Sequence, residues 1–168
     1  NLEIELTGPE LPGGDGSCLP FLKCLQSAQP VEQDVAAAVY AITDPITVRE
    51  GDAMIAALPG EGQELSILYD LDYSNNNALG RQVYAINLTA EQFISQVAPA
   101  RTFLLQHEAE YLRQNGYGKH LTYQDILVLA PDGRPIENTF RFPDEPVRHK
   151  ILDLVGDLAL LGRALRQR

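Results

Sequence analysis

The segment from residue 147 to residue 162 constrains the fold of this chain more than any other. Its apolar residues recur at steps of three and four positions, at Val147, Ile151, Leu154, Val155, Leu158 and Leu161. That spacing places them along one stripe of an α-helix, and Gly162 follows as a typical helix end. Such a stripe is stable mainly when it packs against other parts of the chain. The segment therefore predicts a long amphipathic helix.

The stretch from Val35 to Leu71 has the pattern of β-strands. Short apolar runs fall at 39–42, 46–48, 54–57 and 65–68. Charged or glycine-containing turns separate the runs, which is typical of an antiparallel meander. A further alternating segment runs from Gln82 to Leu88, and the asparagines at 75–77 begin an exposed loop before it.

Shorter elements complete the predicted order. They are helices at 17–28, 89–97 and 108–114, with Ser17 and Thr89 as N-caps, and strands at 2–6 and 126–129. This order of strands and helices is typical of the α+β class, in which an antiparallel sheet packs on helices.

The charge of the chain excludes several partners. It carries 23 acidic against 13 basic side chains, a net charge of −10, which repels nucleic acid and anionic membrane surfaces. No apolar run reaches the roughly 20 residues that span a bilayer, so we expect no stable membrane insertion. Cys18 and Cys24 match no common zinc spacing and are expected to be reduced thiols in a cytoplasmic protein. The start at Asn1 and the single Met54 suggest a truncated piece of a longer polypeptide.

Three polar residues share one face of the predicted C-terminal helix. His149, Asp153 and Asp157 are spaced four apart, so each lies about one turn beyond the last. An imidazole and a carboxylate placed in this way can bind the same metal ion, and a hydrolytic zinc site uses three protein ligands and a water. Iron would also accept these ligands. The alternative is a surface pair of His149 and Asp153 worth a few tenths of a kcal/mol (about 0.2–0.5).

Three blocks of sequence resemble one enzyme family, the UDP-3-O-acyl-N-acetylglucosamine deacetylases. Residues 141–162 are similar to the zinc-binding helix of that family, with Arg-Phe-x-Asp-Glu, Val-Arg-His-Lys-x-Leu-Asp and Gly-Asp-Leu in order. The Ala-Arg-Thr-Phe at 100–103 resembles the block before the acyl-binding insert, and Glu-Tyr-Leu follows at 110–112. The stretch 8–21 looks like the end of the first domain.

The resemblance implies a fold and a division of the chain. The fold would be a two-domain α+β sandwich with antiparallel sheets packed on helices. Residues 1–29 would end the first deacetylase domain. Residues 30–168 would form the second domain, with the acyl-binding insert and the zinc helix, so that only the second domain is largely present.

The resemblance also implies a reaction and a set of roles. The reaction is zinc-dependent deacetylation of UDP-3-O-(3-hydroxyacyl)-N-acetylglucosamine, an early committed step of lipid A synthesis, by a cytoplasmic monomer. The roles carried over by position are Zn²⁺ ligands for His149 and Asp153, an oxyanion hydrogen bond for Thr102, orientation of a downstream histidine for Asp157, and substrate binding for Phe103 and Lys150.

The departures from the family leave part of the site open. The third zinc ligand and the general base belong to a Glu-His-Leu motif that this chain lacks, and His107 and His120 do not match it. We therefore expect negligible activity from the chain alone. Residues 116–125 replace a Gly-Gly-Ser segment found in many members, which leaves the length of the acyl chain undetermined.

Other interpretations remain beside the family assignment. The chain could be a non-catalytic module that binds the nucleotide sugar, or another zinc hydrolase that shares only the helix. Thr102 could simply cap a helix. Leu104, Leu105, Tyr111 and Leu112 could line an acyl groove or pack a core, with the core favoured by composition.

Overall fold

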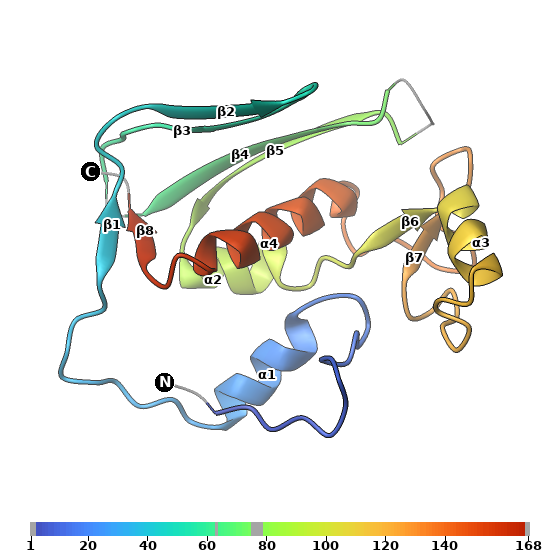
Figure 1. Cartoon of the computed structure of the whole chain (residues 1–168), viewed down its shortest axis with the longest axis horizontal. Coiled ribbons are helices and arrows are strands. Elements are labelled where there is room, and N and C mark those ends of the chain that lie inside the picture. The colour runs from blue at the N-terminus through green and yellow to red at the C-terminus, as the bar shows by residue number, and fades with distance from the viewer. Residues whose placement is uncertain (1–2, 63, 75–78, 167–168) are drawn as a thin grey trace.

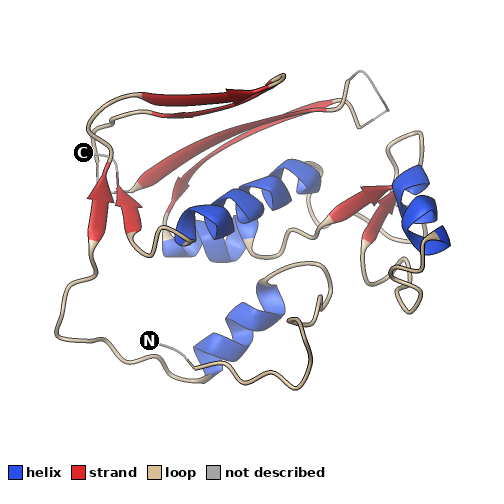
Figure 2. Cartoon of the chain, viewed as in Figure 1, coloured by secondary structure: helices blue, strands red, loops and turns tan. Residues whose placement is uncertain are grey.

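The computed structural model describes residues 3–62, 64–74 and 79–166, and its central element is the long helix α4, Glu145–Ala159 (Figure 1). Strands β4 (Leu65–Asp72) and β5 (Arg81–Leu88) run along one side of this helix as an antiparallel pair. Helix α4 coincides with the amphipathic segment predicted from sequence. The α+β class with a sheet on helices is likewise confirmed (Figure 2).

The hairpin β4–β5 turns one face to α4 and the other to solvent. Ile67 and Ile86 are paired across the strands and pack with Val97 and Ile151 in one apolar cluster. Full burial of such a side chain stabilises a fold by about 1.5–3 kcal/mol. On the opposite face, Leu68 is exposed, as the period of two residues in a strand requires.

A second apolar cluster lies at the N-terminal end of α4. Strands β6 (Phe103–Leu105) and β7 (Leu127–Leu129) pair in parallel there. The buried members of the cluster are Leu71, Leu79, Phe103, Leu105, Leu127, Leu129 and Val147. The predicted strand at 126–129 is confirmed, whereas β6 was not predicted because three residues carry too little pattern.

The predicted strands between Val35 and Leu71 form, but they do not make one antiparallel meander. Strands β2 (Ile46–Glu50) and β3 (Ala53–Ala57) form a hairpin of their own. Strand β1 (Val39–Ala41) instead pairs in parallel with β8 (Ala164–Arg166), which the sequence did not predict. The chain turns at Gly162, whose φ of +66° suits glycine, and this turn brings β8 beside β1.

The shorter helices match their predicted positions closely. They are α1 (Leu19–Ser27), α2 (Ala90–Gln92), a π-helical turn at Phe93–Val97, and α3 (Gln106–Gln114). The Thr89 hydroxyl accepts a hydrogen bond from the Gln92 N–H at 3.0 Å, so its role as N-cap is confirmed. Cys18 takes the N-cap position of α1, while the Ser17 hydroxyl accepts from the Leu19 N–H at 3.3 Å.

The strand predicted at 2–6 does not form, and the loop predicted at 75–77 is not described by the structure. Residues 3–6 are exposed and form no strand, because none of the described strands lies beside them to supply hydrogen bonds. Residues 1–2 and the loop predicted at 75–77 lie outside the described residues. The thiols of Cys18 and Cys24 are free, as expected. No helix within the described ranges is long and apolar enough to cross a membrane.

Arg148 fixes the rotation of α4 against the rest of the fold. Its guanidinium carbon lies 4.0 Å from the centre of the Tyr84 ring and 4.5 Å from that of Phe142. Its nitrogens also donate to the Asp144 carboxylate at 2.6 Å and to the Gln96 side chain at 2.7 Å. The side chain therefore joins α4 to β5 and to the π-helical turn.

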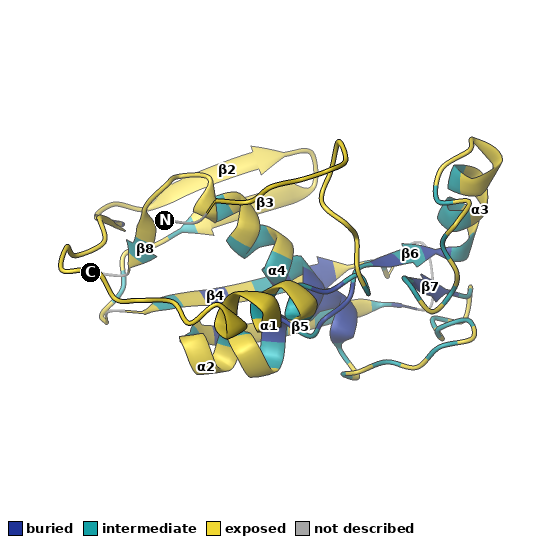
Figure 3. Cartoon of the chain, turned by 90° about the horizontal axis from the view of Figure 1, so that it is seen from below, coloured by how far each residue is buried: buried dark blue, intermediate teal, exposed yellow. Residues whose placement is uncertain are grey.

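The deepest polar contact in the described structure joins Arg101 to Glu145, the first residue of α4. The side chains are 6% and 0% exposed, and Arg101 Nε lies 2.8 Å from Glu145 Oε1. Arg101 Nη2 donates to Oε2 at 3.1 Å, and the backbone N–H groups of Arg101 and Arg141 donate to the same carboxylate. Figure 3 shows buried residues gathered around this end of α4, with β2, β3 and α1 largely exposed.

We expect single substitutions of this pair to destabilise the fold far more than a matched double substitution. Glu145→Leu or Arg101→Met alone leaves one buried charge without its partner and should cost about 3–5 kcal/mol of unfolding free energy. The double variant should recover most of that loss, because it leaves no buried charge. Urea unfolding of the three variants and the wild type measures this. Additive losses would show that the two side chains are not coupled.

Candidate metal and substrate site

His149 and Asp153 meet on α4 one turn apart. The distance between His149 Nε2 and Asp153 Oδ1 is 3.2 Å. The imidazole is buried, with 9% of its side chain exposed, whereas 43% of the Asp153 side chain is exposed. The sequence prediction that these two groups converge is confirmed. Their surroundings differ from those of a surface pair, because the histidine is held inside the fold.

A contact with a backbone carbonyl shows that one particular ring nitrogen of His149, Nδ1, carries a hydrogen. Its Nδ1 lies 3.0 Å from the carbonyl oxygen of Ala100, which can only accept a hydrogen bond. Nδ1 must therefore carry the proton in this contact. The other ring nitrogen, Nε2, points toward the Asp153 carboxylate. Metal-binding histidines are commonly oriented in this way by a bond from the second ring nitrogen.

The Asp153 carboxylate is held in its charged form. Burial raises the pKa of this group, but hydrogen bonds from His149 and Lys150 and the charges of those residues lower it to about 2. The Lys150 ammonium donates to Asp153 Oδ2 at 2.9 Å. Burial alone would lower the pKa of Lys150, and the hydrogen bond and charge of Asp153 raise it on balance. Both groups are therefore charged at neutral pH.

Phe103 and Lys150, the predicted substrate-binding residues, lie beside each other. The Lys150 ammonium is 5.7 Å from the centre of the Phe103 ring. Just after β4, Tyr73 approaches Phe103 edge to face, with ring centres 6.0 Å apart and an angle of 67° between the rings. Two aromatic rings thus lie one after the other next to the ammonium group that binds Asp153.

Thr102 lies on the connection between Ala100 and β6, where a neighbouring loop holds its backbone. Its N–H donates to the carbonyl of Gly16 at 2.7 Å, and its own carbonyl accepts from Leu127 N at 3.4 Å. Thr102 caps no helix, because α3 begins after Leu105. Arg141 fastens the same loop by donating to Asp15 at 2.7 Å and to the Pro99 carbonyl at 2.8 Å.

Asp157 stands apart from this group. It lies one turn beyond Asp153 on α4 and is exposed. Among the described residues, its side chain makes no hydrogen bond or ion pair, and its backbone carbonyl accepts from Leu160 N at 3.1 Å. The structure therefore brings His149, Asp153, Lys150 and Phe103 together, while Asp157 meets no histidine in the described ranges.

The donor atoms of His149 and Asp153 fit a zinc ion. One is the Nε2 atom of an imidazole and the other is an oxygen of an ionised carboxylate; zinc binds both kinds of ligand once the imidazole nitrogen has released its proton. Within residues 3–62, 64–74 and 79–166, no group of three or more His, Cys, Asp or Glu is placed to hold a metal. The described residues thus offer two ligands, and a hydrolytic zinc site uses three.

A separate apolar cavity lies between α3, the strands β6 and β7, and the loop at 117–126. Its volume is about 430 Å³. Leu104 and Leu112 line it, together with Tyr117, Leu121, Tyr123 and Ile126. Leu105 instead packs in the core, and Tyr111 is 66% exposed. Of the four residues weighed for a groove or a core, two therefore line a cavity.

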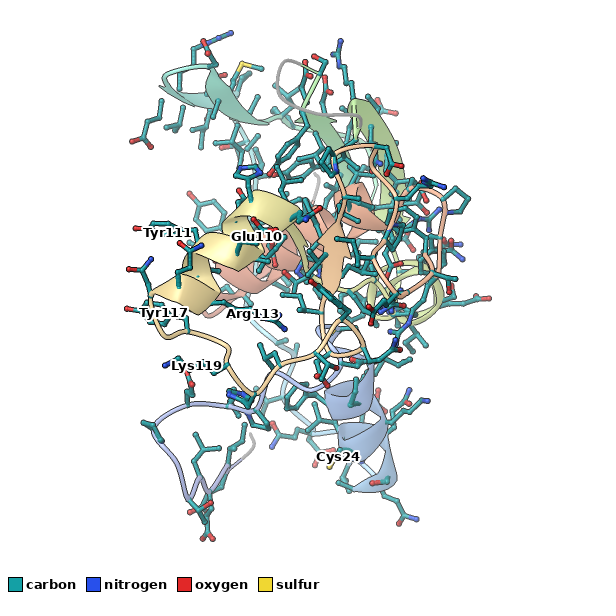
Figure 4. The ribbon with its side chains drawn as sticks, turned by 90° about the vertical axis from the view of Figure 1, so that its right-hand side faces the viewer. Cys24, Glu110, Tyr111, Arg113, Tyr117 and Lys119 are labelled. Atoms are coloured by element: carbon teal, nitrogen blue, oxygen red, sulfur yellow. The ribbon has the colours of Figure 1, made fainter. Side chains whose placement is uncertain are left out.

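Arg113 holds one wall of this cavity in place. It donates to the Leu121 carbonyl at 2.9 Å, and its guanidinium carbon lies 5.4 Å from the centre of the Tyr123 ring. Figure 4 shows Glu110, Tyr111 and Arg113 on α3, with Tyr117 and Lys119 on the turn that follows and Cys24 on the distant helix α1.

The sequence did not predict the groups that hold His149 in its orientation, or the ion pair next to them. Arg101 and Glu145 are 44 positions apart, and the Ala100 carbonyl has no side-chain signal at all. The only local hint of this ion pair is the position of Arg101 next to the apolar residues 103–105. An arginine buried beside such residues needs a partner of opposite charge.

The chain matches known proteins over its whole length. Residues 1–168 match the family described as LpxC, UDP-3-O-acyl N-acetylglycosamine deacetylase. Relatives named UDP-3-O-acyl-N-acetylglucosamine deacetylase include one from Nostoc sp., 41% identical over 167 residues, and one from Thermosynechococcus vestitus, 40% identical over 162 residues. Each alignment covers 96% of this chain, and a relative from Chlamydia pneumoniae is 37% identical over 97% of it.

The chain spans somewhat more than half the length of these relatives. The aligned part covers 58% of the Nostoc protein, 55% of the Thermosynechococcus protein and 57% of the Chlamydia protein. Each relative therefore contains further sequence that has no counterpart among the 168 residues.

The lowered pKa of Asp153 predicts a small acid-sensitive contribution to stability. The ordinary value of 3.8 falls to about 2 in the folded chain, so the stabilisation is present above pH 4 and is lost as the pH falls toward 2. Solvent screening at this exposed carboxylate should limit it to less than about 1 kcal/mol. Urea unfolding of wild type and Asp153→Asn between these pH values should show the difference closing. Asp157→Asn is the control on the same helix, and an equal effect there would contradict the assignment.

Gly16→Ala should weaken the contact that holds Thr102. Gly16 has a φ of +80°, and an added Cβ would lie 3.3 Å from Thr102 Cγ2 and 3.4 Å from the Asp125 carbonyl. The left-handed conformation alone costs an alanine about 1–2 kcal/mol. Gly51→Ala is the control, because its φ is +58° with open space around it. Thermal unfolding should show a larger loss for Gly16→Ala, and equal losses would mean that the contact with Thr102 adds nothing.

Proposed function

Because the chain belongs to the family of UDP-3-O-acyl-N-acetylglucosamine deacetylases, we propose that it supplies one side of the active site of a metal-dependent amide hydrolase. The observation that carries this proposal is the state of His149. Its Nδ1 is bound to the Ala100 carbonyl, and its Nε2 lies 3.2 Å from a carboxylate that stays ionised. A surface pair would need neither the buried ring nor the fixed proton.

The proposed substrate is the one in the names of the relatives, UDP-3-O-acyl-N-acetylglucosamine. Hydrolysis would break the amide bond between the acetyl group and the sugar nitrogen, and the products are a free amine and acetate. We further propose that this reaction is an early step of lipid A synthesis and that a monomeric protein carries it out in the cytoplasm.

His149 and Asp153 are the proposed metal ligands, and zinc is the proposed metal. A zinc ion bound there supplies Lewis acidity, which lowers the pKa of a bound water and polarises the amide carbonyl. The third ligand and the general base would come from sequence beyond this chain, where the relatives are longer. Lys150 keeps the Asp153 carboxylate ionised and oriented through its hydrogen bond at 2.9 Å.

Thr102 is the proposed donor to the oxygen that becomes negative during hydrolysis. Its backbone is hydrogen-bonded to Gly16 through the N–H and to Leu127 through the carbonyl. Two residues earlier, the Ala100 carbonyl accepts a hydrogen bond from His149, which holds the same segment. A donor on a fixed backbone costs little reorganisation when charge develops on the substrate. Asp157, exposed on α4, is the proposed partner of a histidine further along the polypeptide.

Phe103 and Lys150 are the proposed binding groups for the sugar and the polar part of the substrate. Their side chains lie 5.7 Å apart beside the His149–Asp153 pair. The apolar cavity at α3 suits the acyl chain, because its lining is formed mainly by leucine, isoleucine and aromatic residues. The assignment of residues 1–29 to a first domain and 30–168 to a second belongs to the same proposal.

A second function is supported by one observation. Among the described residues, no third His, Cys, Asp or Glu joins His149 and Asp153 in a metal-binding group. A module with the aromatic residues, Lys150 and the cavity could bind the nucleotide sugar without hydrolysing it. The two functions differ in whether acetate is released.

The deciding experiment measures zinc-dependent release of acetate from UDP-3-O-acyl-N-acetylglucosamine by the full-length polypeptide. His149→Ala should abolish both zinc binding and turnover. Thr102→Ala should lower kcat by about 10²–10³, the usual cost of one oxyanion donor. Removal of zinc by a chelator should abolish turnover, and added zinc should restore it.

Two controls make the result specific. Thr102→Ser keeps the hydroxyl and should retain most of the activity that Thr102→Ala loses. The 168-residue chain alone should bind the substrate without turning it over, because a hydrolytic site needs a third ligand. A full-length polypeptide that binds the sugar and releases no acetate would favour the binding module instead.

A further inference from the structure

A single peptide unit joins the buried Glu145 carboxylate to the ring of His149. The N–H of Arg101 donates to Glu145 Oε1 at 3.0 Å. The carbonyl of Ala100, which belongs to the same peptide group, accepts from His149 Nδ1 at 3.0 Å. Glu145 and His149 are four residues apart on α4, so the peptide bridges two side chains one helical turn apart.

The geometry of the peptide makes this bridge directional. In a trans peptide the N–H and C=O point in opposite directions within one plane. An anion at the N–H end draws the hydrogen toward itself and increases the negative charge on the carbonyl oxygen, since linked hydrogen bonds polarise one another. The carbonyl that receives the His149 proton is therefore a stronger acceptor than an isolated one.

We propose that Glu145 is a positioning residue for His149 and acts on it through the peptide between Ala100 and Arg101. The carboxylate fixes the plane of that peptide and strengthens its carbonyl, which keeps Nδ1 as the donor to that carbonyl and Nε2 as the ring nitrogen that faces Asp153 and would bind the metal. This inference rests on the proposed role of His149 as a metal ligand, and it adds a residue that lies behind the ligand and would not touch the metal.

The surroundings of Glu145 separate this role from simple anchoring. Oε1 accepts from both the backbone N–H and Nε of Arg101, while Oε2 accepts from Nη2 of Arg101 and from the Arg141 N–H. The Arg101 guanidinium has two further acceptors, Asn138 Oδ1 at 3.0 Å and the Thr139 carbonyl at 2.7 Å. The ion pair and the peptide bridge thus share one carboxylate and can be altered separately.

The test compares Glu145→Gln with Arg101→Lys in the 168-residue chain without metal. Both variants disturb the same buried ion pair. Only Glu145→Gln removes the charge that faces the Arg101 N–H, because Arg101→Lys keeps the carboxylate and the backbone. The readout is whether Nδ1 of His149 carries a proton, from ¹⁵N NMR of the two ring nitrogens at the same pH in every variant.

In wild type and Arg101→Lys, we expect the signals of a ring protonated at Nδ1. In Glu145→Gln, part of the molecules should lack the proton on Nδ1, and the zinc concentration needed to shift the His149 signals should rise about tenfold or more. Equal changes in both variants, or no change in either, would overturn the proposal. Urea unfolding of each variant reports the loss of the ion pair separately.

The wild-type chain provides a test that does not depend on a variant folding. A wild-type His149 without a proton on Nδ1 would contradict the proposal directly, as would an Arg101 amide proton without the downfield shift of a bond to a carboxylate. These outcomes are distinct from a failure of the proposed function, which acetate release by the full-length polypeptide measures.

Discussion

The rest of the structure depends on the buried contact between Arg101 and Glu145. It connects the first turn of α4 to the segment that leads into β6, across 44 residues of sequence. Removing two charges from water is costly, and the contact persists because nearly every polar atom in it has a partner. Once it forms, the Ala100 carbonyl, Thr102 and His149 have little freedom left. The buried ion pair therefore holds the residues of the candidate site in place, although it does not itself belong to the site.

Local patterns predicted the elements of the fold, and contacts distant in sequence decided how they pair. Helix α4, the Thr89 cap and the strands β4 and β5 follow from periodicity and from the chemistry of single residues. The parallel pairs β1–β8 and β6–β7 could not be predicted, because each joins short strands from remote parts of the chain. At 2–6 an alternating pattern predicted a strand that does not form, because no described strand lies beside it to pair with.

The same distinction applies to the candidate site. The spacing of His149 and Asp153 was sufficient to predict that they meet, because both lie on one helix face. Thr102, Phe103 and Lys150 were assigned by resemblance, and only packing shows that Phe103 and Lys150 are neighbours. The Ala100 carbonyl, which fixes the ring of His149, is a backbone atom and leaves no trace in the sequence. Side-chain patterns thus indicate ligands more readily than the groups that orient them.

The π-helical turn at Phe93–Val97 contains one residue that the geometry of the site does not require. Ala98 N donates to Phe93 O at 2.8 Å, so this turn holds one residue more than an α-helical turn would. Deletion of one residue here would let the turn close in α-form, and the segment after it would keep nearly the same direction, because an α-helical turn covers about the same rotation with one residue fewer. The Ala100 carbonyl would then still face His149. Homologous chains that differ by one residue in length at this turn can therefore keep the same arrangement around the metal ligands.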